Sequence, residues 1–478
     1  MSEYETVIGL EVHVHLATKT KAFCGCSTEF GNEPNSQTCP VCLGLPGSLP
    51  VLNEQYLEYA MRTALALNCK ISNFTKFDRK NYYYPDLPKN YQISQYDLPL
   101  SLSGYVMINI EGKEKKIGIT RVHMEEDAGK LIHEEAKPIS LVDYNRTGVP
   151  LLEIVSEPDI NSPDEAYEYL SNLKAILKYI EVSDCDMEKG SLRCDANISV
   201  RKKGEKKLGV KTELKNMNSF KAVKVALEYE SQRQVEELKE GGEIIQQTLL
   251  WDTDKNITVP MRTKEEAHDY RYFPDPDLVP FTISQKQIDD IGQALPELPQ
   301  QRFDRFITKL GLTEYDATII IQDKDLSDYF EQCLKLLNEP KKISNWLIGP
   351  LMQELKERKV GIVELGLKPE YLIGLIQLVA NGTISNLVAK DVFKQVIATD
   401  VSPEEIVKKD NLAQVSDEGA LQEMADSVIA ENQKSVESYR AGKENALMFL
   451  VGQVMKKTKG KANPKLVQEL LKRRLQDA

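Results

Sequence analysis

Polar and apolar residues alternate along several segments of the first 290 positions of the chain. Every second residue from Ile8 to Leu16 is apolar, and the positions between them include Glu11, His13 and His15. A period of two predicts a β-strand with one buried face and one polar face. That polar face would display a carboxylate and two imidazoles side by side. A half-exposed edge strand with solvated side chains explains the same pattern, so both interpretations stay open.

Two further segments repeat this arrangement. The segment 192–201 alternates in the same way and places Asp195 on its polar face. The segment 116–127 ends in three consecutive carboxylates, of which Glu125 and Glu126 are the first two. Both segments are therefore predicted to be strands that carry charged groups on one side.

A lone carboxylate, Glu153, stands inside the apolar segment 150–155. Burying a carboxylate is costly unless it is paired or binds a metal, so Glu153 is the least ordinary acid of the chain. Ligand-type side chains thus come from four predicted strands: His13, Glu126, Glu153 and Asp195. Carboxylates with one imidazole suit Mg²⁺ or Mn²⁺ better than zinc.

The pattern changes near residue 295, where helical periodicity replaces the alternation. The clearest helical segments are Glu314–Leu337, Pro369–Ala380, Ile384–Ala398 and Ala420–Val436. Pro296 and Pro299 predict an interruption, and Ser402 before Pro403 predicts a capped helix start. We therefore predict an α+β fold with three domains: residues 1–293, a helical domain at 294–404 and a small helical tail at 405–478.

Four of the eight cysteines crowd into one short segment. They form two chelating pairs twelve residues apart: Cys24, Cys26, Cys39 and Cys42. Four thiolates at this spacing favour a tetrahedral structural zinc site with no open coordination position. Four unrelated thiols are the alternative. The other four cysteines are scattered and are expected to be core residues.

Composition limits the class of protein. The chain has 478 residues, of which 41% are hydrophobic and 28% charged, which excludes a disordered or collagen-like protein. Its longest apolar run is far shorter than the roughly 18 residues of a membrane span. The first residues carry acids where a secretory signal would carry bases. We expect a soluble cytoplasmic protein.

Charge is distributed unevenly along the chain. Residues 441–478 have nine Lys/Arg against three Asp/Glu, while the whole chain has a net charge of −12. A basic tail on an acidic body suggests that the tail meets a polyanionic partner, although a solvated helix end is the common alternative. The candidate residues for binding such a polyanion are Lys456, Lys457, Lys459, Lys461 and Arg473.

Longer motifs resemble one known family, whereas no Walker A loop, dinucleotide-binding turn or serine-hydrolase elbow is present. These motifs are Phe77–Pro85, Tyr91–Gln95, His123–Gly129, Leu141–Pro158 and Asp269–Pro274. With them, the chain resembles the B subunits of the glutamyl/aspartyl-tRNA amidotransferases from residue 5 to its end.

The resemblance implies an ATP-dependent ligase that amidates Glu-tRNA(Gln) or Asp-tRNA(Asn). ATP and Mg²⁺ would convert the side-chain carboxylate into an acyl phosphate, which ammonia then attacks. A separate glutaminase (amidase) subunit would supply the ammonia through a tunnel, and a small third subunit would complete the heterotrimer. The implied fold is a cradle-like domain with an antiparallel sheet, followed by helical and tail domains.

The resemblance also implies roles for individual residues. The family's metal ligands correspond to His13, Glu126 and Glu153. Further active-site positions correspond to Glu11, Lys80, Glu125 and Asp195. Zinc binding by the cysteines is not universal in the family.

Two other functions remain possible from the residues. One is a non-catalytic, zinc-stabilised adaptor that binds tRNA. The other is a metal-dependent hydrolase in which His13 and the acids activate water. ATP consumption that depends on mischarged tRNA separates the ligase from both.

Overall fold

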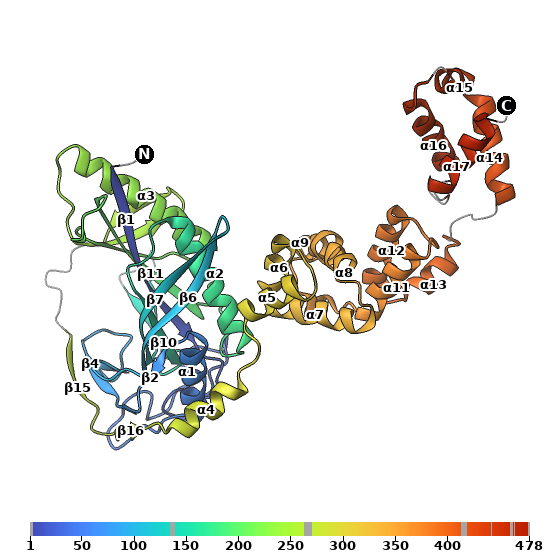
Figure 1. Cartoon of the computed structure of the whole chain (residues 1–478). Helices are drawn as coiled ribbons and strands as arrows, with labels where there is room; N and C mark the ends of the chain where they lie inside the picture. The colour runs from blue at the N-terminus through green and yellow to red at the C-terminus, as the bar shows by residue number, and fades with distance from the viewer. Residues whose placement is uncertain are drawn as a thin grey trace. The chain divides into compact units, whose positions relative to one another are not determined.

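The computed structural model describes residues 3–133, 139–261, 270–412, 418–440, 442–458, 462 and 464–476. The chain divides into two compact units, Met1–Arg302 and Phe303–Ala478. Both units are drawn in Figure 1.

Nine described strands of the first unit form one sheet, in the order β14-β13-β12-β11-β1-β10-β7-β6-β2. Their bounds are β1 Tyr4–His15, β2 Lys70–Ile71, β6 Ser101–Ile110, β7 Lys113–Glu126, β10 Pro150–Ser156, β11 Leu192–Lys202, β12 Thr212–Lys215, β13 Thr248–Asp252 and β14 Ile257–Pro260. Neighbouring strands are antiparallel except β12 and β13, which are parallel. The predicted α+β class is confirmed.

Helices cover the apolar face of this sheet (Figure 1). They are α1 Glu54–Ala66, α2 Pro163–Tyr179 and α3 Phe220–Lys239. The buried side chains Leu10 and Val12 of β1 share one core with Leu173 of α2 and Ala226 of α3. The strands predicted from alternation are present, with their apolar faces in this core, because burying one face fixes the direction of every second side chain.

Short strands and one helix complete the first unit. The strands are β3 Phe74–Thr75, β4 Asp78–Asn81, β5 Tyr91–Ser94, β8 Lys130–His133, β9 Ser140–Asp143, β15 Arg271–Pro274 and β16 Phe281–Thr282; the helix is α4 Gln285–Ala294. Strand β4 lies between β15 and β5, with Lys80 opposite Tyr272 and Gln92. This small sheet brings together residues that are nearly 200 positions apart in the sequence.

The second unit is helical in its described part. Its elements begin with α5 Pro299–Thr308, which crosses the division, and continue with α6 Glu314–Ile321, α7 Lys324–Leu336, α8 Pro340–Trp346, the π-helical turn Leu347–Leu351, α9 Met352–Arg358, α10 Ile362–Leu365, α11 Pro369–Ala380, α12 Asn386–Thr399, α13 Pro403–Lys409, α14 Glu418–Glu431, α15 Gln433–Arg440, α16 Asn445–Lys457 and α17 Pro464–Gln476. Helices α5–α13 and helices α14–α17 form two separate hydrophobic cores.

Two predicted helices are each divided into two. The segment 314–337 breaks where Asp323 caps α7 by accepting a hydrogen bond from the backbone N–H of Leu326. The segment 420–436 breaks at Asn432, whose side chain bonds the carbonyl of Val428. Polar side chains that bond nearby backbone groups end helices that an apolar pattern alone would continue. The predicted domain boundaries after residues 293 and 404 stay predictions.

No helix in the described ranges combines the length and the apolar composition that crossing a membrane requires.

We expect Gly104→Ala to destabilise the first unit. A Cβ at this position would lie 2.6 Å from the carbonyl oxygen of Leu67 and would also meet Cys69 Sγ. Overpacking of this kind costs about 1–3 kcal/mol. Urea unfolding followed by the fluorescence of Trp251, in a Trp346→Phe background, measures this unit specifically, because the chain has two tryptophans. An unchanged transition would contradict the expectation.

Candidate functional site

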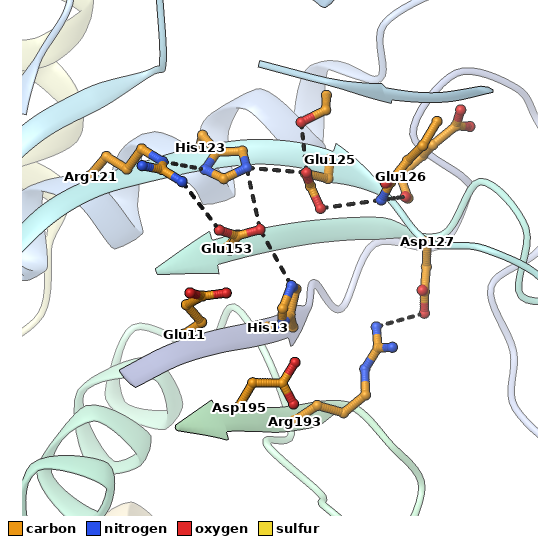
Figure 2. A network of polar contacts seen from close by, with 12 residues as sticks. Glu11, His13, Arg121, His123, Glu125, Glu126, Asp127, Glu153, Arg193 and Asp195 are labelled. Atoms are coloured by element: carbon orange, nitrogen blue, oxygen red, sulfur yellow. Dashed lines mark hydrogen bonds and ion pairs between the residues drawn. The ribbon is translucent and has the colours of Figure 1, made fainter. Parts of the chain in front are cut away.

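Polar side chains gather on the face of the large sheet that faces away from the helices. In the antiparallel register, His13 of β1 lies opposite Glu153 of β10 and Arg193 of β11. Glu11 lies opposite Asp195. Paired residues of antiparallel strands point to the same side, so all five side chains share one face (Figure 2).

Two of these residues, His13 and Glu153, form a group that suits a metal ion together with Glu125 of β7. One ligand atom from each lies within 4.8 Å of the other two. His13 Nε2 is 3.4 Å from Glu153 Oε2, and both glutamates are buried. Two carboxylates and one imidazole are donors that Mg²⁺ and Mn²⁺ accept. The predicted pair of His13 and Glu153 is therefore brought together.

The predicted third ligand, Glu126, lies elsewhere. Its carboxylate pairs with Lys89 and accepts a hydrogen bond of 2.9 Å from the backbone N–H of Ile93. Consecutive strand residues point to opposite faces, so only one of Glu125 and Glu126 can face His13. The structure turns Glu125 toward the group and Glu126 away from it (Figure 2).

The remaining predicted site residues surround this group. Lys80 is mostly buried on β4, and the carboxylates of Glu125 and Glu153 raise its pKa although burial opposes its charge. Burial, followed by the Glu153 charge, raises the pKa of Glu11, which accepts a 3.0 Å bond from Asn197. Asp195 is held by a lysine of β12, Lys215, at 2.7 Å.

Sequence reasoning missed two residues of this network, Arg121 and His123. His123 Nε2 lies 3.1 Å from Glu125 Oε1 and 3.6 Å from Glu153 Oε2. Arg121 lies 3.5 Å from Glu153 and donates to His123. Burial raises the pKa of Glu125, but the hydrogen bond and the charge of His123 outweigh burial and lower this pKa. The signal was present in the sequence, because positions 121, 123 and 125 alternate with Val122 and Met124.

Asp127 is a further buried acid, located where β7 ends. His15, Arg146 and Arg193 lie within 2.5, 3.2 and 3.0 Å of its carboxylate. Burial raises the pKa of Asp127, but the Arg193 and Arg146 charges outweigh burial and the pKa lies below its usual range. The carboxylate thus joins three separate segments beside the group formed by His13, Glu125 and Glu153.

The four clustered cysteines also meet in space. The Sγ atoms of Cys24, Cys26, Cys39 and Cys42 lie within 4.8 Å of one another. The Cys24 thiol, the backbone N–H of Cys39 and the Lys21 ammonium together lower the pKa of Cys42 to about 4, against the effect of burial. Four mutually close thiols, one of them favoured as thiolate, fit a tetrahedral zinc ion.

A buried lysine adjoins the cysteines. Lys21 has no exposed surface, and its Nζ lies 2.7 Å from the carbonyl of Gln37, 3.4 Å from that of Tyr144 and 3.7 Å from Cys42 Sγ. A buried ammonium requires a negative partner. The Cys42 thiolate supplies that charge.

Three of the five predicted residues of the basic tail belong to the described residues. Lys459 and Lys461 lie outside the described residues. Lys456, Lys457 and Arg473 are exposed, and Lys457 pairs with Glu431 at 2.5 Å. No acid among the described residues forms an ion pair with Lys456 or Arg473. These two cations are thus available to an external anion.

Comparison with known proteins identifies the family. A family model described as the GatB/GatE catalytic domain matches residues 6–289, and one described as the GatB domain matches residues 328–475. The chain belongs to the GatB family. This confirms the resemblance inferred from the motifs. The match to the catalytic domain includes the strands that carry His13, Glu125 and Glu153.

Full-length relatives agree with this assignment. A protein of Carboxydothermus hydrogenoformans is 57% identical over 478 residues, with 99% of each chain covered. One of Thermoanaerobacter sp. is 58% identical over 473 residues, also with 99% of each chain covered. One of Thermodesulfovibrio yellowstonii is 54% identical over 469 residues, with 98% of each covered. Each is named as the B subunit of an aspartyl/glutamyl-tRNA(Asn/Gln) amidotransferase.

We expect Asp127→Asn to lower the free energy of unfolding of the first unit by about 2 kcal/mol at pH 7, because it removes the carboxylate shared by three partly buried basic side chains. Asp97→Asn, which removes a mostly exposed partner of Lys76, should cost less than about 1 kcal/mol. Because the folded-state pKa of Asp127 is depressed, its contribution is complete above the ordinary value of 3.8 and declines progressively as pH falls from that value through the folded-state pKa. Urea unfolding at pH 7 and pH 3.5 checks both points. Equal losses in the two variants would contradict the prediction.

Proposed function

We propose that this chain is the B subunit of an aspartyl/glutamyl-tRNA(Asn/Gln) amidotransferase and that its large sheet carries the ATP-dependent step. The observation that carries the proposal is the group formed by His13, Glu125 and Glu153, with Lys80 beside it. The names of the full-length relatives support the overall activity. The substrate would be the side-chain carboxylate of glutamate on tRNA(Gln), of aspartate on tRNA(Asn), or of both.

The reaction has two balanced steps. A carboxylate oxygen of the aminoacyl-tRNA forms a bond to the γ-phosphorus of ATP, and the bond to the β–γ bridging oxygen breaks to release ADP. Ammonia nitrogen then attacks the acyl carbon, and phosphate leaves with the electrons of the C–O bond and with one of the ammonia protons, so that an amide and hydrogen phosphate form. The first step converts a poor electrophile into one with a good leaving group, and it depends on positioning and charge neutralisation.

The residues divide these tasks among themselves. His13, Glu125 and Glu153 would hold Mg²⁺, which would neutralise charge on the transferred phosphoryl group. Lys80 would position an anionic substrate group, since its raised pKa keeps it cationic. The resemblance implies Glu126 as a metal ligand, and this role stays a prediction. Substitutions of Glu125 and Glu126 distinguish the two possible ligand sets.

A base is needed because free ammonia is mostly ammonium at neutral pH. Glu11 suits this role better than Asp195, since its pKa is raised whereas Asp195 is held by Lys215. A carboxylate with a raised pKa accepts a proton more readily near neutrality. The proton of the ammonium would pass to Glu11 before nitrogen attacks.

Two further subunits would belong to the complete enzyme. A separate glutaminase (amidase) subunit would release ammonia, and a small third subunit would complete a cytoplasmic heterotrimer, as the sequence resemblance implies. Misacylated tRNA would be the substrate that the three subunits share.

Replacing glutamate by glutamine removes the charge of the side chain and keeps its shape, which tests whether these carboxylates bind the metal. In the complete amidotransferase, supplied with ATP, ammonium and Glu-tRNA(Gln), Glu125→Gln and Glu153→Gln should lower the rate of Gln-tRNA formation about a hundredfold or more. Glu126→Gln is the matched control on the other face. Loss of activity in Glu126→Gln with normal activity in Glu125→Gln would favour the motif-derived ligand set. Normal rates in Glu153→Gln would reject both sets.

The same assay separates the alternatives. An adaptor would leave Gln-tRNA formation independent of these carboxylates, and a hydrolase would release product without ATP. ADP formation that requires mischarged tRNA supports the ligase.

We expect one zinc ion per chain at the cysteine cluster. Elemental analysis of protein purified without chelators should give a stoichiometry near one, and Cys39→Ser should abolish it. Lys21→Met should weaken zinc retention, because it removes the buried cation beside Cys42. Cys333→Ala, in the core of the second unit, is the control and should keep its zinc. Wild-type protein without zinc would contradict the assignment.

The basic tail should hold tRNA through its phosphates. Removing residues 413–478 spares Ile406 and Val407, which belong to the core of α5–α13, and should weaken tRNA binding and flatten its salt dependence. The double variant Lys456→Glu/Arg473→Glu should do the same in the full chain. Lys390→Glu/Lys394→Glu on α12 changes the net charge equally and is the control. Equal tRNA affinities and equal salt dependence in the two double variants would indicate that the tail is only a solvated helix end.

A further inference from the structure

Arg193 of β11 is a cation on the polar face of the large sheet whose bonds within the chain are incomplete. It lies opposite His13 of β1, and Figure 2 shows it reaching toward Asp127. Its Nη2 is 3.0 Å from Asp127 Oδ2, but this ion pair lacks the alignment of a hydrogen bond. Its buried Nε has no hydrogen-bond partner among the described residues, although the side chain is 37% exposed. The two reaction steps assign no task to this guanidinium.

Asp127 does not account for Arg193, because two other basic side chains share the same carboxylate. His15 Nε2 lies 2.5 Å and Arg146 Nε 3.2 Å from Asp127 Oδ2. Arg146 also donates to two backbone carbonyls, at 3.0 and 2.8 Å, so its guanidinium is satisfied within the chain. Buried polar groups are nearly always hydrogen-bonded in native proteins. The buried Nε of Arg193 is therefore suited to a ligand that accepts a hydrogen bond.

A guanidinium favours one class of ligand, the flat oxyanion. Its N–H groups form a rigid fork that matches the paired oxygens of a carboxylate or a phosphate. The proposed reaction brings two anions of this kind to the sheet. They are the phosphates of ATP and the side-chain carboxylate of the aminoacyl-tRNA.

The order of the strands places Lys80 and Arg193 on opposite sides of His13. Across the sheet the order is β11-β1-β10-β7, so Arg193 lies beyond His13 on the side away from β7. The small sheet that carries Lys80 adjoins β7, since Gln92 of β5 donates to Glu125 at 3.2 Å. In-line phosphoryl transfer places the attacking and leaving oxygens on opposite sides of phosphorus. The two cations are thus suited to two different anions.

The general base indicates which anion lies beside Arg193. Glu11, the proposed base, is opposite Asp195, which is two residues from Arg193 on the same strand and the same face. The base must be close to the acyl carbon, because it takes the proton of the ammonium whose nitrogen attacks there. The acyl group therefore lies on the side of β1 and β11, and the phosphoryl donor lies on the side of Lys80.

We propose that Arg193 binds the side-chain carboxylate of the aminoacyl-tRNA and is a further catalytic residue. The inference rests on the proposed ATP-dependent function. One carboxylate oxygen accepts a hydrogen bond from Arg193 while the other forms the bond to phosphorus. When nitrogen adds to the acyl carbon, the first oxygen becomes an oxyanion, and the same N–H stabilises its charge. Arg193 keeps its protons in both steps.

Binding without chemistry tests the proposal. In the complete amidotransferase without ATP, the wild type should bind Glu-tRNA(Gln) about tenfold more tightly than Gln-tRNA(Gln), because only the first carries a carboxylate for the guanidinium. Arg193→Met should remove this difference and leave the KM for ATP unchanged. Arg193→Lys retains the charge but not the fork, so it should keep only part of the difference. Arg146→Lys is the matched control, since Arg146 also pairs with Asp127, and it should keep the full difference.

Chemical rescue separates a catalytic role from a structural one. Arg193→Ala should lower the rate of Gln-tRNA formation about a hundredfold, as expected for the loss of a donor to an oxyanion. Millimolar guanidinium chloride should restore part of this rate in Arg193→Ala. It should not restore the rate of Arg193→Met, whose longer side chain fills the same space.

Each outcome supports or overturns the proposal. Equal wild-type affinities for the two tRNAs, or an unchanged difference in Arg193→Met, overturn it while the ATP-dependent function stands. A raised KM for ATP with an unchanged difference assigns the guanidinium to the phosphates and also overturns it. If Arg193→Met loses thermal stability, rescue of Arg193→Ala decides, and absence of rescue counts against the proposal. Absence of ATP-dependent amidation in the wild type rejects the function instead, and the binding comparison then judges Arg193 alone.

Discussion

The register of β1 between β10 and β11 is the constraint on which the rest of the first unit depends. A slip of one residue would move Ile8, Leu10 and Val12 to the polar side and His13 into the core. The apolar face cannot leave helices α1–α3 without exposing the main core, so hydrophobic burial fixes the polar face as well. The position of His13 opposite Glu153 is therefore set by residues that take no part in the chemistry.

The same face must also keep its charges compensated. Glu125, Glu153 and Asp127 are buried, and each lies against an imidazole or a guanidinium: His123 of the same strand for Glu125, His13 for Glu153 and Arg193 for Asp127. Burial alone would favour their neutral forms, but these cations lower their pKa values. Among the described residues, Glu11 has no such partner, and its pKa is raised. One sheet face therefore holds three carboxylates that are favoured in the ionised form beside one whose neutral form is favoured.

Local pattern predicted much of this arrangement, and long-range pairing explains what it missed. Alternation gave β1, β11 and the polar face with Glu11 and His13, because a period of two is visible in a single strand. Which of Glu125 and Glu126 faces His13 depends on which face of β7 is buried, and the buried Val122 and Met124 direct Glu125 toward His13. The pairing of β15 with β4, which places Tyr272 beside Lys80, joins segments that no local pattern connects. The helix breaks at Asp323 and Asn432 depend on single side-chain bonds that periodicity does not record.

The cysteine cluster is connected to the polar face through ordinary hydrogen bonds. Lys21 joins Cys42 to the carbonyl of Tyr144, and the backbone of Gln37 donates to Asn145. The next residue along the chain, Arg146, donates to the carbonyls of Ala128 and Gly129 and pairs with Asp127. A few residues later the chain enters β10, which carries Glu153. A metal ion held by the four thiols would thus fix the segment that leads into β10, at a distance from the reacting groups. Its effect on the reaction would be indirect, since no thiol belongs to the group formed by His13, Glu125 and Glu153.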